Sequence, residues 1–153
     1  MKQIKNSYYA SIVIILLLSS KTSCQTITAD ISYGELVDKI TILTIKSERI
    51  SNPEKLHNVH TELESLQKTY DEYIGNRKDA EQLKEVLKNV NQTLWDIEDA
   101  IRIKERNKEF DDEFITIARN VYITNDKRCI IKKEIDRLMG SDITEEKSYE
   151  DIL

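Results

Sequence analysis

The chain has 153 residues, about the size of a single domain with one modest hydrophobic core. Three glycines and one proline are too few for the turns of a β-rich fold, and 39% apolar residues are too many for a disordered chain. The formal net charge is −5, and residues 25–153 carry 20 basic against 28 acidic side chains. This stretch lacks the excess of Lys and Arg that nucleic-acid binding requires, so we expect no nucleic-acid partner.

Residues 1–24 have the composition of a secretory signal. Lys2 and Lys5 precede an apolar run from Tyr8 to Leu18, and a polar stretch follows it. The run is short for a membrane span, which needs about 20 residues. This leader predicts an exported or membrane-tethered protein that contacts a membrane only if the leader stays uncleaved. The alternative, which stays open, is a cytoplasmic protein whose assigned start lies too far upstream.

Capping signals open the first helix, predicted over about 33–51. Ser32 and Glu35 have the spacing of a capping box, and Ile31 and Leu36 occupy the positions of a hydrophobic staple. The helix carries apolar residues on more than one side, which indicates that other helices sandwich it.

The second and third helices each carry apolar residues at heptad spacing. The second is predicted over about 53–74, between Asn52-Pro53 and Gly75, with the seam Leu56, Val59, Leu63, Leu66, Tyr70 and Tyr73. The third is predicted over about 79–107, with the seam Leu83, Leu87, Val90, Leu94, Ile97 and Ile101. Because the connection has only about four residues, we expect these two coiled-coil-like helices to form a long antiparallel hairpin.

The fourth helix is predicted over about 111–138. Acidic residues from Asp111 to Glu113 match its first turn, and Gly140 ends it. The predicted fold class is therefore all-α, a four-helix arrangement over 32–140 built on a long antiparallel helical hairpin. We expect the polar residues 141–153 to form a tail along its surface, and Cys129 to be a buried apolar residue.

His57 and His60, the two histidines, are three residues apart on the second helix. Two ligands are too few for a metal site, and no further ligand group is placed near them, so we expect no metal and no cofactor.

Polar residues of the third and fourth helices form the candidate site. Asn91, Trp95, Glu98 and Arg102 recur three or four residues apart beside the apolar seam. Polar residues also interrupt the apolar stripe of the fourth helix. If the first, third and fourth helices pack together, these groups meet around Trp95 as a structural network or as a weak binding site for an anionic ligand. The candidate cluster is Arg49, Trp95, Glu98, Arg102, Arg119, Asn125, Asp126 and Arg128.

Four blocks of the sequence resemble the signature blocks of a family of small uncharacterised bacterial proteins, a domain of unknown function. The blocks are ISYGELVDKITILTIKSERI, LWDIEDAIR, ARNVYITNDKRCIIKKEI and MGSDITEEKSY. The resemblance implies an association with glycosyltransferases and other surface-polysaccharide proteins, and it supplies no catalytic residues. Family members start just before the SYGEL block, so the leader departs from the pattern. The polar residues that match the blocks are Asp38, Lys46, Arg49, Trp95, Glu98, Asp99, Arg102, Arg119, Asn125, Asp126 and Arg128.

Three functions fit these features. The first is a non-enzymatic helical interaction or accessory protein, linked to cell-envelope polysaccharide assembly, which binds a protein partner or a second copy through its helical seams. The second is a domain that binds a small anionic, sugar-phosphate-like molecule, or a small helical enzyme acting on one. The third is an exported coiled-coil spacer. An enzymatic role is less favoured than a binding role, because no motif in the sequence specifies a reaction.

Overall fold

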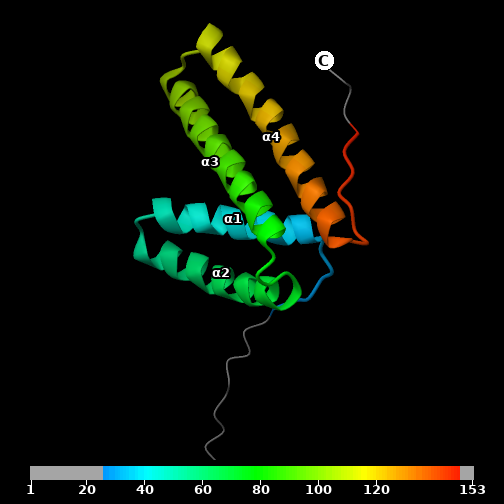
Figure 1. The fold of residues 1–153 in the computed structure, drawn as a ribbon. Helices are drawn as coiled ribbons and strands as arrows, with labels where there is room; N and C mark the ends of the chain where they lie inside the picture. The colour runs from blue at the N-terminus through cyan, green and yellow to red at the C-terminus, as the bar shows by residue number, and fades with distance from the viewer. Residues whose placement is uncertain (1–25, 149–153) are drawn as a thin grey trace, which may run out of the picture.

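The computed structural model describes residues 26–148, which form four α-helices and no strand (Figure 1). None of these helices is long and apolar enough to cross a membrane. The predicted leader, residues 1–24, lies outside the described range, as do residues 149–153. The all-α class is confirmed, and every helix end lies within two residues of its predicted position. The helices are α1 (Tyr33–Arg49), α2 (Pro53–Tyr73), α3 (Lys78–Asn107) and α4 (Asp112–Met139).

Side-chain caps set where α1 and α2 begin. The backbone N–H of Glu35 donates to Ser32 Oγ at 3.1 Å, and that of Lys55 donates to Asn52 Oδ1 at 3.0 Å. Both N-caps were predicted from the sequence. The reciprocal half of the predicted capping box does not form, because the Glu35 carboxylate instead accepts from Lys132 of α4 at 2.6 Å.

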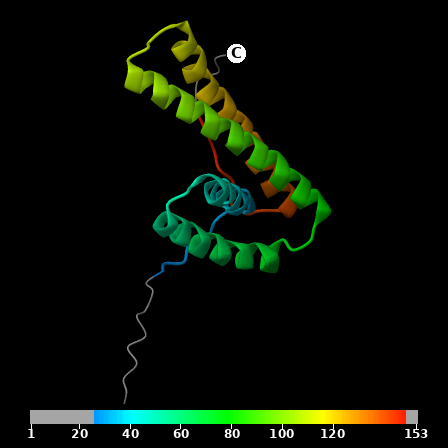
Figure 2. The same ribbon diagram turned by 90° about the vertical axis from the view of Figure 1, so that its left-hand side faces the viewer.

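The helices pair as two hairpins, α1 with α2 and α3 with α4, and the hairpins cross (Figures 1 and 2). The prediction that the second and third helices pair was therefore wrong: the long hairpin is α3–α4, and within residues 26–148 the backbone of α2 does not approach that of α3. The reason is the composition of α1. Its apolar surface packs against the seam of α2 on one side and against the α3–α4 hairpin on the other, as predicted for a sandwiched helix.

The core lies where the two hairpins cross. Val37 and Ile40 of α1 pack there with Leu87 of α3 and Ile135 of α4, and each is at most 1% exposed. Tyr70, near the end of α2, is equally buried and donates its hydroxyl to Glu81 of α3 at 2.5 Å. Burial and the neighbouring Glu81 raise the pKa of this tyrosine. The core thus joins all four helices near one end of the long hairpin.

The far half of the long hairpin extends beyond α1. At 1.5 Å per residue α3 and α4 are about 45 and 42 Å long, whereas α1 is about 26 Å long. At the tip the apolar seam is replaced by Lys104, whose ammonium group lies 2.8 Å from Asp111 and 2.5 Å from Glu113. These carboxylates raise the pKa of Lys104, Asp111 foremost. Ion pairs around Lys104 therefore hold the end of the hairpin, together with the edge-to-face contact between Phe110 and Phe114.

Candidate functional site

An open cleft of about 450 Å³ lies between α1, α3 and α4, next to the core. Its apolar lining comes from Ile42 and Ile45 of α1 and from Leu94 and Trp95 of α3. Its polar lining is Asn91, Glu98, Asp99 and Arg102 of α3 with Arg128 of α4. The open cleft therefore combines an apolar floor with a few polar groups at its walls and rim.

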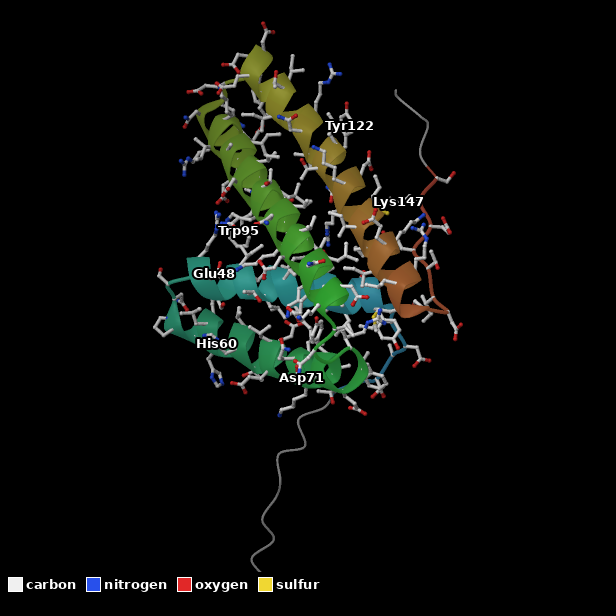
Figure 3. All side chains as sticks on the ribbon, in the orientation of Figure 1. Glu48, His60, Asp71, Trp95, Tyr122 and Lys147 are labelled. Carbon is white, nitrogen blue, oxygen red and sulfur yellow. The ribbon has the colours of Figure 1, made fainter. Side chains whose placement is uncertain are left out.

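Trp95 is held in place on the cleft wall by two charged neighbours. Its indole Nε1–H donates to Asp99 Oδ2 at 2.9 Å, and the guanidinium of Arg49 lies 5.9 Å from the centre of the ring. Arg49 in turn donates to Asp96 at 2.5 Å, and this hydrogen bond raises the pKa of Arg49. Figure 3 shows Trp95 beside the end of α1 that carries Glu48. The tryptophan is half-buried, as the polar residues around it in the sequence indicated.

A buried ion pair forms the inner wall of the cleft. Asp38 of α1 is 1% exposed and accepts from both Nε and Nη2 of Arg128, the former at 2.8 Å. The side-chain amide of Asn91 donates to Asp38 Oδ1 and to Thr41 Oγ1, each at 2.9 Å. The hydrogen bonds to Asp38 raise the pKa of Arg128. This network ties α1, α3 and α4 together at one point.

Arg102 stands on the outer rim of the cleft. Its side chain is 72% exposed and donates to Glu98 Oε2 at 2.9 Å, one helical turn earlier on α3. An exposed i,i+4 pair of this kind contributes about 0.3–0.5 kcal/mol, so another anion can displace it at little cost.

The structure brings only part of the predicted cluster together. Glu98, Arg102 and Arg128 line the same cleft as Trp95, and Arg49 lies over its ring. Arg119 and Asp126 lie on the exposed outer face of α4. Their placement in the cluster was wrong, because α4 turns that face away from α3.

Asn125 is half-buried and lies outside the lining of the cleft. It accepts weakly from Arg128 Nη1 at 3.5 Å. Arg49, Arg102 and Arg128 each have a carboxylate partner.

The two histidines have no part in the site. His57 and His60 are exposed on α2, and no group of three or more potential metal ligands occurs in the described part of the chain. Cys129 is a buried free thiol, as expected.

A second polar network, which the sequence did not predict, closes the start of α1 onto α4. The backbone N–H of Gly34 donates to Asp136 Oδ1 at 2.6 Å, and a Cβ at Gly34 would lie 2.5 Å from the carbonyl oxygen of Lys132. Lys132 is 7% exposed and lies 2.6 Å from both Glu35 and Glu145. Burial alone would lower the pKa of Lys132, but the two carboxylates more than offset it and the pKa is raised. Glycine is therefore required for this close approach of two helices.

Asp38, the central buried partner of the cleft wall, was not singled out as a site residue in the sequence analysis. Its signal was present but general: Asp38 lies in the SYGEL block, next to the fully buried Val37 and one turn before Ile42. A carboxylate placed on an apolar helix surface calls for a basic partner from another helix.

Fold and cleft together define an all-α domain of two crossed hairpins with a small polar-rimmed cleft at the crossing. The chain belongs to a family of unknown function, DUF6165, whose model matches residues 27–153. No curated protein and no solved structure matches the chain.

Proposed function

We propose that this domain is a non-enzymatic binding module whose cleft holds a small polar molecule with an anionic group, of the sugar-phosphate class. The observation that carries the proposal is the cleft itself, whose lining includes Arg102, Arg128 and the half-buried Trp95. A flat apolar surface beside guanidinium donors suits a sugar ring that carries a phosphate or carboxylate.

Both arginines have donor capacity left for a ligand. A guanidinium has five N–H groups, and three of those on Arg128 are engaged with Asp38 and Asn125, so two remain. Arg102 has one exposed partner, Glu98, which an incoming phosphate can replace. The buried pair with Asp38 fixes the orientation of Arg128, and a fixed donor loses less entropy when a ligand binds.

The charges around the cleft favour a ligand with few negative charges. Arg102 and Arg128 carry two positive charges, and Glu98, Asp99 and the buried Asp38 carry three negative ones, so the net charge of these groups is −1. A polyanion would be repelled by the carboxylates, whereas sugar hydroxyl groups can donate to them. We expect weak binding, with a dissociation constant of about 0.1–1 mM, because only a few groups of the cleft contact the ligand.

A binding role is preferred to a catalytic one because of the residues that line the cleft. Among the described residues, its lining includes no Ser, Cys or His. An accessory role in cell-envelope polysaccharide assembly, which the family resemblance implies, agrees with a sugar-phosphate ligand.

Thermal-shift assays with a panel of sugar phosphates, sugar acids and nucleotide-sugar diphosphates test the proposal. We expect at least one member to raise the melting temperature of the wild-type chain and to lose this effect in Arg102→Met. Arg106→Met is the matched control, because Arg106 is exposed on the last turn of α3 and does not line the cleft. Equal ligand shifts in the wild type and Arg102→Met would contradict the proposal.

A second candidate function is a helical interaction module. Four large apolar side chains on α4 stay exposed, and two of them, Ile115 and Ile130, are more than half exposed. Monomeric proteins expose single apolar residues routinely, but a repeated series along one helix face indicates a partner.

A further inference from the structure

The outer face of α4 carries a series of exposed apolar residues. Ile115 is 54% exposed and Ile130 58%, and Tyr122 and Ile123 are each more than a third exposed. Figure 3 shows Tyr122 on the side of α4 turned away from α3. These residues recur at intervals of seven or eight, so they share one face of the helix. We call this face, together with the two charged residues on it, the α4 stripe: Ile115, Arg119, Tyr122, Ile123, Asp126 and Ile130.

The chemistry of the α4 stripe is symmetric about its middle. Ile115 and Ile130 lie at equal distances from the point between Tyr122 and Ile123. Two residues of opposite charge, Arg119 and Asp126, lie at equal distances from the same point. A face with this symmetry is complementary to itself when one copy is turned end over end.

We infer that the α4 stripe pairs with the α4 stripe of a second copy of this chain, antiparallel, about a two-fold axis between Tyr122 and Ile123. In this arrangement Ile115 packs against Ile130 of the second copy, and Arg119 faces Asp126 of the second copy. The two-fold axis forms each of these contacts twice. The charges set the direction of the pairing, because parallel helices would place Arg119 against Arg119 and Asp126 against Asp126.

The two charged residues of the α4 stripe, Arg119 and Asp126, do not form ion pairs with neighbouring turns of α4. The residues three and four positions from Arg119 and from Asp126 are Ile, Thr, Tyr or Cys, so neither has a charged neighbour on α4. Both side chains are exposed. The described tail runs along α4 beside Asn125, Arg128, Cys129, Lys132 and Lys133. It leaves Asp126 and Ile130 exposed.

The size of the α4 stripe predicts weak association. Ile115 and Ile130 are about 22 Å apart along a helix about 10 Å wide. A contact of this size buries less surface than about 1,200 Å², the area at which specific stable interfaces begin. We therefore expect a dissociation constant of roughly 100 μM.

This inference rests on the second candidate function and is independent of the cleft. Sedimentation velocity of the full chain, from about 10 μM to about 1 mM, measures it. We expect the wild type to shift from monomer to dimer over this range. Arg119→Glu and Asp126→Arg should each weaken association at least tenfold, since each places like charges opposite one another twice. The double variant restores opposite charges and should dimerise as the wild type does.

Lys127→Glu is the matched control, an exposed charge reversal on α4 outside the α4 stripe, and it should leave the dimer intact. All variants keep residues 1–25, so association through those residues would be common to the set. A double variant that stays monomeric would overturn the antiparallel pairing. Equal association of the wild type and both single variants would overturn the surface itself, and so would a monomeric wild type at every concentration. None of these results bears on ligand binding at Trp95.

Discussion

Arg128→Met is the substitution that bears most directly on how the cleft wall is held. It removes the partner of Asp38, whose side chain is 1% exposed and then keeps only the amide of Asn91 as donor. Breaking a buried ion pair by removing one partner costs about 3–5 kcal/mol. Because the Arg128 side chain is 27% exposed and water can enter its place, we expect about 3 kcal/mol. This is a large share of the about 5–15 kcal/mol by which a domain is stable.

Urea unfolding followed by circular dichroism at 222 nm measures this loss. The double variant Asp38→Leu with Arg128→Met removes both charges. Its loss in free energy of unfolding should be smaller, by at least about 2 kcal/mol, than the sum of the losses of the two single variants. A loss below about 1 kcal/mol for Arg128→Met, or additive losses in the cycle, would refute the view that the pair holds α1 to α4.

Three further predictions concern other contacts of the fold. Gly34→Ala should cost about 1–3 kcal/mol in urea unfolding, because its Cβ would lie 2.5 Å from the Lys132 carbonyl oxygen; an unchanged midpoint would contradict this. The hydrogen bond from Lys132 lowers the pKa of Glu145, so its carboxylate stabilises the fold above the unfolded pKa of about 4.3 and this contribution disappears as pH falls. Glu145→Gln should thus have a lower free energy of unfolding than the wild type at pH 7, and this difference should vanish in acid. A difference that does not change with pH would refute this prediction. Lys104→Met leaves carboxylates crowded at the hairpin tip, so hydrogen exchange should quicken in residues 105–113 and remain unchanged near Gly34.

Most of the helix boundaries were predictable because the signals that set them are local. Ser32, Asn52 and Asp111 each accept from a backbone N–H three residues later, and Gly75 and Gly140 both have a positive φ. The pairing of the helices was not local. The connections on either side of α3 are similarly short, so loop length alone could not show that α3 pairs with α4 and not with α2.

The candidate site was only partly predictable for a related reason. Trp95 and Arg102 lie beside a clear apolar seam on α3, so the face they occupy could be read from the sequence. On α4, apolar residues such as Ile117 and Ile123 fall on different faces, and nothing local decides which face is buried. Arg119 was consequently assigned to the inner face, whereas it lies on the outer one.

The central claim is that the cleft beside Trp95 binds a small anionic molecule, and Trp95 is the only tryptophan of the chain. Its intrinsic fluorescence therefore reports on the cleft without a label. Titration of the full chain with sugar phosphates, and with inorganic phosphate alone as reference, should change the emission of Trp95 saturably. We expect Arg102→Met to weaken this response at least tenfold and Arg106→Met to preserve it. An emission spectrum that no member of the panel changes, or a response equal in all three proteins, would contradict the account.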